Sequence, residues 1–342
     1  MSGARWTDWR RLAGLSAIAA VVIAAVVVAI TVGLGSPGSP AGHSTPERAL
    51  PRMPVAIPAP ARGAYFGAWV DPTMYGQHGH IGAVNALQAQ IGRRLDIVHT
   101  YLRQDAAFPN ASDLAWMRQG SMLLVSWALN DTRGIAAGEW DASIRQRARE
   151  FKALGKPVFL EWRWEMDRPN IRSQIGTPAD YVAAWKHIRL IFADEHVTNV
   201  AWVWCPTARG FASGRAQAYY PGNNEVDWVC ADAYPRPGTQ ASFADVVHPF
   251  LAWAARHPEP IMIGEYGVPQ SYSAERRAQW LHDAEQTVVR DRQIKALLYF
   301  DSNITGPSPL TSYGLDAGPL AAFRDIADNR YFNPSGGPVN RN

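Results

Sequence analysis

Hydrophobic and polar residues alternate along most of the chain with two periods, one typical of strands and one typical of helices. From Gly63 onward, short runs of β-branched and aromatic residues are followed by longer stretches with apolar residues at helical spacing. Eight such runs occur, at 64–71, 96–103, 122–129, 157–166, 199–207, 226–234, 260–267 and 294–302. Each run predicts a strand.

The stretches between these runs carry helix signals. Thr177, Pro178 and Asp180 begin one helix with a capping hydroxyl, a proline at the first position and an acid in the first turn. Asp141 and Ser273 are placed to cap two further helices. The chain is therefore expected to alternate strand and helix.

Strands that alternate with helices indicate a parallel sheet with helices on its outside. Eight such units over about 270 residues fit a closed (β/α)8 TIM barrel, for which ~250 residues is typical. An open doubly wound sheet is the alternative, but no glycine-rich phosphate loop follows the first strand. We predict a barrel at 63–332 and a flexible tail at 333–342.

An uncharged apolar run of 23 residues occupies positions 12–34. At ~1.5 Å rise per residue it would cross a ~30 Å hydrocarbon core as one transmembrane helix. Three arginines precede it, so the positive-inside rule predicts a cytoplasmic segment at 1–11 and an extracytoplasmic remainder. A cleaved signal peptide is the alternative, although its apolar region is usually only ~7–15 residues long. The Pro- and Gly-rich segment 35–62 is expected to be a linker.

The net charge of +3 originates in the N-terminal region. Residues 1–62 carry six Arg and two acidic residues, whereas the remainder carries 27 basic and 28 acidic residues. The predicted barrel is therefore nearly neutral and has no basic stripe that would suit a nucleic-acid backbone. We expect a monomer that does not bind nucleic acid.

Cys205 and Cys230 are the two cysteines of the chain. No Cys/His cluster has zinc spacing, so neither a structural metal nor a cofactor is expected. Outside the cytoplasm the pair can form a disulfide. Two buried free thiols are the alternative, and both interpretations stay open.

In a barrel of this kind the active site lies at the carboxyl ends of the strands. The fourth run places Glu165 there, and the seventh places Glu265. Cleavage of a glycosidic bond needs two carboxylates facing one cleft: one protonates the departing oxygen, and the other attacks the anomeric carbon or activates water. One such glutamate alone more often caps a helix or pairs with Arg, but two on these strands favour catalysis.

Several segments recur in the order and spacing of a known family. They are Trp164-Glu165-Met166-Asp167, 181–192, 200–206, 219–222, 226–229, Asp232-Ala233-Tyr234 and 261–267. Together they resemble glycoside hydrolase family 26, over about 155–305 and more weakly back to Gly63. The resemblance implies that Glu165 is the acid/base, that Glu265 is the nucleophile and that the mechanism is retaining. It also implies that Asp232 and Tyr234 face the site and that Tyr234 hydrogen-bonds the nucleophile.

The chain departs from the family's pattern beside the acid/base. Relatives commonly have His before it and Asn two residues after it, where this chain has Trp164 and Asp167. The last strand has Tyr299-Phe300-Asp301 where a Trp is expected. Mannan is the family's usual substrate, but β-glucan, xylan and a wall-associated glycan remain open.

Glu161, Arg163 and Glu165 alternate, so all three are expected to point into the barrel. Glu161 would lie ~13 Å below Glu165, too deep to reach a sugar. It is therefore expected to form a buried ion pair with Arg163, because an unpaired buried charge is costly. In the alternative, Arg163 holds Glu265 ionised and takes part in the site.

Three further residues are candidates for the substrate cleft. His99, on the second predicted strand, either lines the cleft or is a hydrogen-bonded core residue. Trp127 and Trp204 lie near their strand ends and are either platforms for sugar rings or core residues. Trp164, beside the acid/base, is also expected to contact substrate.

These features predict a membrane-anchored, extracytoplasmic, endo-acting glycoside hydrolase that binds a polysaccharide and needs no cofactor. Two alternatives stay open. One is a catalytically silent carbohydrate-binding barrel, and the other is an accessory of a polysaccharide synthesis or export system.

Overall fold

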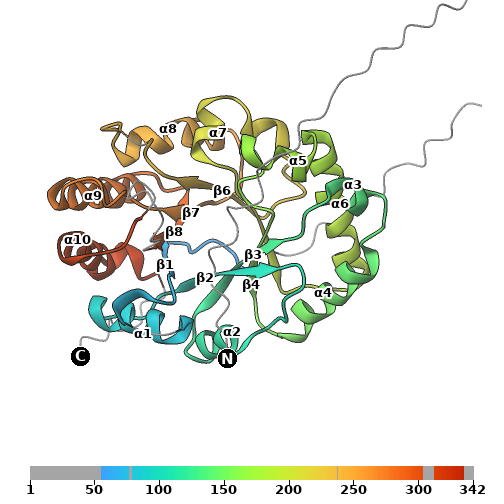
Figure 1. Cartoon of the computed structure of the whole chain (residues 1–342), viewed down its shortest axis with the longest axis horizontal. Helices are drawn as coiled ribbons and strands as arrows, with labels where there is room; N and C mark the ends of the chain where they lie inside the picture. Colours follow the sequence, from blue (N-terminus) through green and yellow to red (C-terminus); the bar gives the residue numbers. More distant parts are fainter. Residues whose placement is uncertain (1–54, 77–78, 237, 303–311, 335–342) are drawn as a thin grey trace, which may run out of the picture. The chain divides into compact units, whose positions relative to one another are not determined.

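Eight parallel strands close into a barrel in which each strand pairs with its sequence neighbours and β8 returns to pair with β1 (Figure 1). The computed structural model describes residues 55–76, 79–236, 238–302 and 312–334. One strand lies within each of the eight predicted runs, so the predicted (β/α)8 barrel is confirmed. The strands are β1 (Tyr65–Val70), β2 (Ile97–Arg103), β3 (Met122–Ala128), β4 (Val158–Trp162), β5 (Val200–Trp204), β6 (Trp228–Ala233), β7 (Ile261–Tyr266) and β8 (Ile294–Asp301).

Helices surround the sheet, as Figure 1 shows. The longer ones are α1 (His80–Ile91), α2 (Ala111–Arg118), α4 (Asp141–Ala153), α6 (Pro178–Asp194), α8 (Phe243–Ala254), α9 (Ala274–Arg290) and α10 (Ala317–Asp328). Shorter turns are η2 (Met74–Gly76), α3 (Thr132–Ala136), η3 (Pro169–Ile171), α5 (Arg172–Ile175), α7 (Ala208–Ala212), η4 (Ala216–Tyr219) and η6 (Arg330–Phe332). Most of these turns lie in the loops that follow the strands, which is where a barrel carries its site.

Two of the predicted helix caps are present. The hydroxyl of Thr177 accepts a hydrogen bond from the backbone of Asp180 at 3.1 Å and begins α6, and Ser273 caps α9 in the same way. The prediction for Asp141 is wrong, because this residue is the first of α4 rather than its cap. Its carboxylate lies 2.6 Å from the imidazole of His187 instead.

The side chains on the two faces of the sheet form two hydrophobic layers, one inside the barrel and one beneath the helices. Inside the barrel lie the side chains of Ile97, Leu124, Phe159, Ala201, Val203, Trp228, Met262, Ala296 and Leu298. Between the sheet and the helices lie larger aromatic side chains, such as Trp162, which stacks on Tyr181 of α6 with 5.0 Å between ring centroids. The barrel is therefore packed through its centre, and a substrate can reach it only at an end.

The folded part of the chain begins before residue 63, where the barrel was predicted to start. Ile57, in the expected linker, is 3% exposed and belongs to the cluster inside the barrel. The indole of Trp228, the first residue of β6, donates to the Ile57 carbonyl at 3.0 Å. Ile57 thus covers the amino-terminal end of the barrel, so the prediction of a linker that reaches residue 62 is wrong for this stretch.

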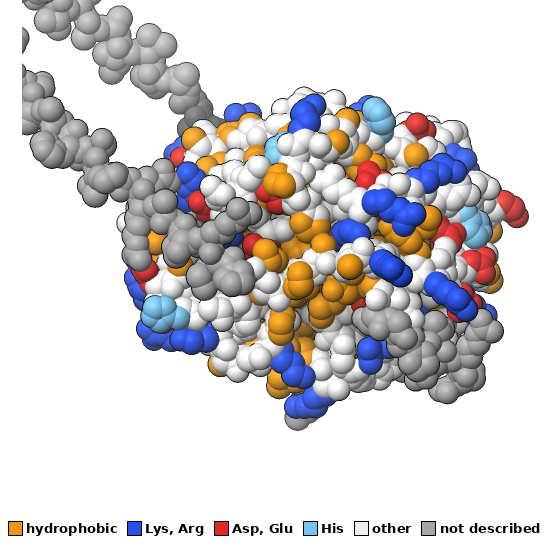
Figure 2. All heavy atoms as spheres, turned by 180° about the vertical axis from the view of Figure 1, so that it is seen from behind, with side chains coloured by type: hydrophobic (Ala, Val, Ile, Leu, Met, Phe, Trp, Pro, Cys, Tyr) orange, Lys and Arg blue, Asp and Glu red, His pale blue; other side chains and the backbone are white. Residues whose placement is uncertain are grey.

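Figure 2 shows the face opposite to that of Figure 1. Hydrophobic side chains gather near its centre, and both basic and acidic side chains are spread around them. The charges on this face are therefore mixed, with neither sign forming a stripe.

The predicted transmembrane helix at 12–34, the segment 1–11 and the first part of the predicted linker lie outside the described residues. So does most of the predicted tail, at 335–342. Within the part of the chain that the structure describes, every helix is too short or too polar to cross a bilayer.

Candidate active site

The chain turns sharply where β4 ends, and this turn places Glu165. The strand stops at Trp162, and Arg163 and Glu165 then adopt left-handed backbone angles, with φ of 48° and 51°. Such angles are uncommon for residues that carry side chains and tend to occur at functional sites. The Glu165 amide donates to the carbonyl of Cys205 at 2.8 Å, so the turn is tied to the end of β5.

Glu161 lies inside the barrel, but not in the predicted ion pair. Its Oε2 accepts from the Ser126 hydroxyl and lies 3.8 Å from Nε2 of His99. Burial raises the pKa of Glu161 well above its usual value and lowers that of His99 to about 3. His99 is 2% exposed and 2.6 Å from the Ser126 hydroxyl, so it is a hydrogen-bonded core residue and does not line the cleft.

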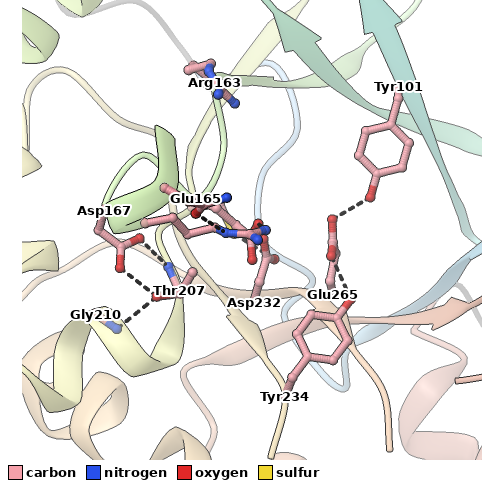
Figure 3. Close-up of polar contacts among 12 residues, drawn as sticks. Tyr101, Arg163, Glu165, Asp167, Thr207, Gly210, Asp232, Tyr234 and Glu265 are labelled. Atoms are coloured by element: carbon pink, nitrogen blue, oxygen red, sulfur yellow. Dashed lines mark hydrogen bonds and ion pairs between the residues drawn. The ribbon is translucent and has the colours of Figure 1, made fainter. Parts of the chain in front are cut away.

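Arg163 departs from the expected alternation, because the alternation ends with the strand. Its guanidinium donates to Gln174 at 3.2 Å and lies 5.7 Å from the centre of the Trp164 ring. The predicted Glu161–Arg163 pair is therefore wrong. No hydrogen bond or ion pair joins Arg163 to Glu265 in the described residues, and Figure 3 shows the two side chains well apart.

Two tyrosines hold Glu265, which lies near the end of β7. Tyr101 of β2 donates to Oε1, and Tyr234 donates to Oε2 at 2.6 Å, from opposite sides of the carboxylate (Figure 3). The pKa of Glu265 is raised to about 7, first by burial and then by the charge of Glu165, while the two tyrosine hydrogen bonds oppose the rise. The predicted bond from Tyr234 is present, whereas Tyr101 was not predicted.

Glu165 is paired with Arg168 from the same loop. Arg168 Nη1 lies 2.5 Å from Glu165 Oε2, and the Arg168 amide donates to the Glu165 carbonyl at 3.0 Å. The Arg168 side chain is 48% exposed and that of Glu165 only 13%, so the arginine covers the carboxylate from the solvent side. Arg168 was not predicted, because its only mark in the sequence is its place three residues after the predicted acid/base.

Asp167, which departs from the pattern that the resemblance implies, supports the loop rather than facing Glu265. Its carboxylate accepts from the Thr207 amide at 2.8 Å and from the Thr207 hydroxyl at 2.6 Å. That hydroxyl accepts in turn from the Gly210 amide at 2.9 Å and so caps α7, as Figure 3 shows. The contacts join the loop after β4 to the loop after β5.

Cys205 and Cys230 form a disulfide within the barrel, next to Asp232. A side chain at Gly264, the residue before Glu265, would approach Cys230 Sγ to 2.6 Å, so the disulfide packs directly against the strand that carries Glu265. Asp232 is 2% exposed, and burial followed by the charge of Glu265 raises its pKa well above the usual value. Although both sulfurs lie near two carboxylates, they are bonded to each other and offer no thiolate to a metal.

Trp127 and Trp204 are core residues, so of the two interpretations the one that makes them sugar platforms is wrong. They are 1% and 0% exposed. Trp127 packs against Phe192 of α6, and Trp204 packs against Trp253 of α8 at 5.4 Å. Their positions in the strand alternation turn both rings toward the helices rather than toward the barrel axis.

Other aromatic rings surround the carboxylates instead. Trp164 lies 5.1 Å from Tyr101, and Trp69 of β1 lies 5.9 Å from the same ring. Trp69 also stacks on Phe300 of β8 with 4.5 Å between centroids. Trp69 and Phe300 were not predicted, although both stand one residue before the end of their strands. These partly exposed rings have the flat apolar faces that suit the face of a sugar.

No protein-family model matches the chain. The chain is 28% identical over 302 residues to endoglucanase H of Acetivibrio thermocellus, an alignment that covers 80% of this chain and 31% of that protein. It is 29% identical over 215 residues to a β-1,3-xylanase of a Vibrio species, covering 60% of this chain and 42% of that protein. The chain thus spans less than half the length of either relative.

Among solved structures, the catalytic domain of a Bacillus endo-β-1,4-mannanase of glycoside hydrolase family 26 is similar, with a TM-score of 0.61 and 17% identity. The similarity covers 82% of this chain and 90% of that one. The resemblance to family 26 is confirmed. At this identity the structural likeness establishes the fold. Glu165 follows β4 and Glu265 lies in β7, the two strands where the resemblance implies the catalytic carboxylates.

Proposed function

We propose that the chain is a retaining, endo-acting glycoside hydrolase that cleaves a β-linked polysaccharide. The observation that carries the proposal is the pair of carboxylates that follow β4 and end β7. Glu165 is near enough to raise the pKa of Glu265 by its charge, and both lie at the end of the barrel where the loops form a mouth. Two carboxylates in one cleft are the chemical requirement for glycosidic cleavage.

In this proposal Glu265 is the nucleophile. It attacks the anomeric carbon, the bond from that carbon to the leaving oxygen breaks, and a glycosyl-enzyme forms. The attack needs the ionised carboxylate, which the hydrogen bonds from Tyr101 and Tyr234 favour. The same two bonds fix the plane of the carboxylate, so the attacking oxygen is oriented before substrate arrives.

Glu165 is the acid/base. It gives its proton to the leaving oxygen in the first step, and in the second step it takes a proton from the water that attacks the glycosyl-enzyme. Glu165 returns to its protonated form, Glu265 is released as a carboxylate, and the product keeps its configuration. Arg168 contacts Glu165 Oε2 in the free protein, so either the proton that Glu165 delivers lies on Oε1 or the arginine gives up that contact.

The relatives suggest the class of substrate. One is named an endoglucanase, one a β-1,3-xylanase and one an endo-β-1,4-mannanase, so glucan, xylan and mannan are all candidates for this chain. The names also support internal cleavage. With the apolar run at 12–34 acting as an anchor, the barrel would face substrate outside the cytoplasm while remaining tethered to the membrane.

The test is hydrolysis by the full chain in detergent micelles. Purified protein would be incubated with β-1,3-glucan, β-1,4-glucan, β-1,3-xylan, β-1,4-xylan and β-mannan, and the products would be sized by chromatography. A ladder of oligosaccharides that Glu165→Ala and Glu265→Ala fail to produce supports the proposal. Binding without cleavage of any polymer, by wild type and variants alike, would favour the silent carbohydrate-binding barrel instead.

A further inference from the structure

Arginines gather on one side of the mouth, around Glu165. The loop after β4 carries Arg163, Arg168 and Arg172, and the loop after β5 carries Arg209 and Arg215. In the described part of the chain, the pair between Arg168 and Glu165 itself is the one ion pair that any of the five makes. The carboxylate of Asp167, next to Arg168, accepts two hydrogen bonds from Thr207, and the charge of Arg215 opposes the rise that burial causes in its pKa.

Three of these guanidinium groups, those of Arg163, Arg168 and Arg209, take part in pKa shifts near Glu165. Arg168 and Arg209 both oppose the rise that burial and the two glutamates cause in the pKa of Tyr313, which reaches about 12. The pKa of Arg163 is lowered to about 10, mainly by burial; the charge of Glu165 opposes the change and the charge of Arg168 contributes to it, which places Arg163 near both residues. The charge is local, because the chain from residue 63 onward carries 27 basic and 28 acidic residues.

Arg163 shows that this side of the mouth is incomplete in the free protein. Its side chain is 8% exposed, yet its Nε has no hydrogen-bond partner among the described residues. Gln174 and the face of the Trp164 ring are its contacts. A buried guanidinium with an unused donor is costly, and an oxygen-rich anion would satisfy it.

Aromatic rings form the opposite side of the mouth, where Trp69 stacks on Phe300 next to the buried Asp301. The two sides therefore suit different parts of a substrate. Because Glu165 has to reach the leaving oxygen, the sugar that carries this oxygen lies against the loop that holds Glu165 and Arg168. The aromatic side is left for the sugar that becomes bound to Glu265.

We propose that the leaving-group side of this cleft binds a sugar with an anionic substituent, a carboxylate or a sulfate or phosphate ester, and that Arg168 determines this specificity. The inference rests on the proposed function. An anionic group on the substrate takes the donors that Arg168 gives to Glu165 in the free protein, since the planar guanidinium matches an oxyanion with two parallel bonds. Glu165 is then released to carry its proton to the leaving oxygen. Arg163 and Arg209 add positive charge around the same position.

The test compares charged and neutral forms of one polymer with the full chain in detergent. Matched pairs are carboxymethylated and plain β-glucan, glucuronoxylan and xylan freed of its uronic acid, and sulfated and plain β-glucan. For wild type, kcat/KM on the preferred charged form exceeds that on its neutral partner by about tenfold or more at low salt. The ratio shrinks as salt rises. The carboxylate and sulfate arms separate the two sources of charge.

Variants assign the effect to Arg168. In Arg168→Gln the ratio of charged to neutral kcat/KM falls to near one, and Arg168→Lys retains only part of it, because lysine keeps the charge but loses the planar fork. Arg256→Gln is the matched control: this exposed arginine follows α8, at the opposite end of the barrel, so its loss leaves the ratio unchanged. A role confined to holding Glu165 would lower activity on both forms equally.

Two outcomes overturn the inference without touching the proposed function. In one, neutral polymers are cleaved as fast as charged ones; in the other, Arg168→Gln preserves the ratio. If no polymer is cleaved, the proposed function fails, and affinity electrophoresis in gels of plain or carboxymethylated β-glucan still decides the inference. Retardation by the charged gel that Arg168→Gln abolishes and Arg256→Gln keeps would uphold it, and equal mobility of wild type in both gels would refute it.

Discussion

Tyr234 donates a hydrogen bond across 2.6 Å to the carboxylate of Glu265, from the strand next to it in the barrel. This bond favours the ionised form of Glu265, so Tyr234→Phe raises the pKa of the glutamate further above its present value of about 7. Because the nucleophile has to be ionised, the rising limb of kcat/KM against pH moves to higher pH, by roughly one unit for a bond of this kind. A pH profile of an activated aryl glycoside measures the shift.

Tyr331→Phe is the control for this prediction. The Tyr331 hydroxyl is buried without a hydrogen-bond partner among the described residues, and its carbonyl contacts Ala64 at the amino-terminal end of the barrel. Its pH profile should match that of wild type. An unshifted limb in Tyr234→Phe would mean that the tyrosine only packs.

Asp301, the last residue of β8, gives the fold a pH dependence of its own. Burial raises its pKa from 3.8 to about 7, against hydrogen bonds from the Tyr75 hydroxyl at 2.5 Å and the Leu315 amide at 3.0 Å. The folded state therefore binds a proton that the unfolded state has lost between about pH 4 and 7, so this residue makes stability fall as pH rises through that window.

Asp301→Asn removes this titration while keeping the size of the side chain. The variant should lose less stability than wild type between pH 5 and 8, by up to about 1.4 kcal/mol for each unit of pKa shift removed. Chemical denaturation at several pH values measures the difference. Parallel curves for the two proteins would show that Asp301 does not titrate there.

The strands and the two glutamates could be predicted, because each depends on a local pattern. Every strand is a short apolar run between helical stretches, and the ends of such runs in a barrel identify the mouth. Glu165 and Glu265 follow from that rule alone. The disulfide stayed open because two cysteines 25 residues apart carry no information about distance in space.

The errors came from the two-residue alternation of side chains along a strand. It was either extended past the end of the strand or assigned to the wrong face of the sheet. Arg163 was expected inside the barrel because the left-handed turn after Trp162 leaves no mark in side-chain chemistry. Trp127 and Trp204 stayed open between cleft and core, because a shift of one residue turns a side chain to the other face of the sheet. Trp69 lies at the mouth and was missed for the same reason.

The apolar run at 12–34 predicts that the full-length protein stays with membranes through washes with high salt and alkaline carbonate. A peripheral protein held by charge would be released by the salt. Cell fractionation followed by immunoblotting measures this. A mature form that begins near Ser36 and appears in the medium would show that the segment is a cleaved signal instead.

The two glutamates have different tasks, and their variants should differ accordingly. Formation of the glycosyl-enzyme always needs the nucleophile, but it needs the acid only when the leaving group is poor. With an activated aryl glycoside, Glu165→Ala should therefore still form the intermediate and then hydrolyse it slowly, because the general base is gone. The loss is typically ~10²–10⁴ in rate, so the remaining activity is measurable.

Azide separates the two roles, because it attacks the glycosyl-enzyme without help from a base. In Glu165→Ala, added azide should restore turnover and give a glycosyl azide with retained configuration, which NMR of the product identifies. Glu265→Ala should be nearly inactive on activated and natural substrates alike, and azide there can only attack the substrate directly and invert it. An inverted azide from the Glu165 variant would exchange the two roles. If both variants match wild type on every substrate that wild type cleaves, hydrolysis does not use this pair, because the loss of either carboxylate would otherwise slow the polymer reaction, whose leaving group is poor.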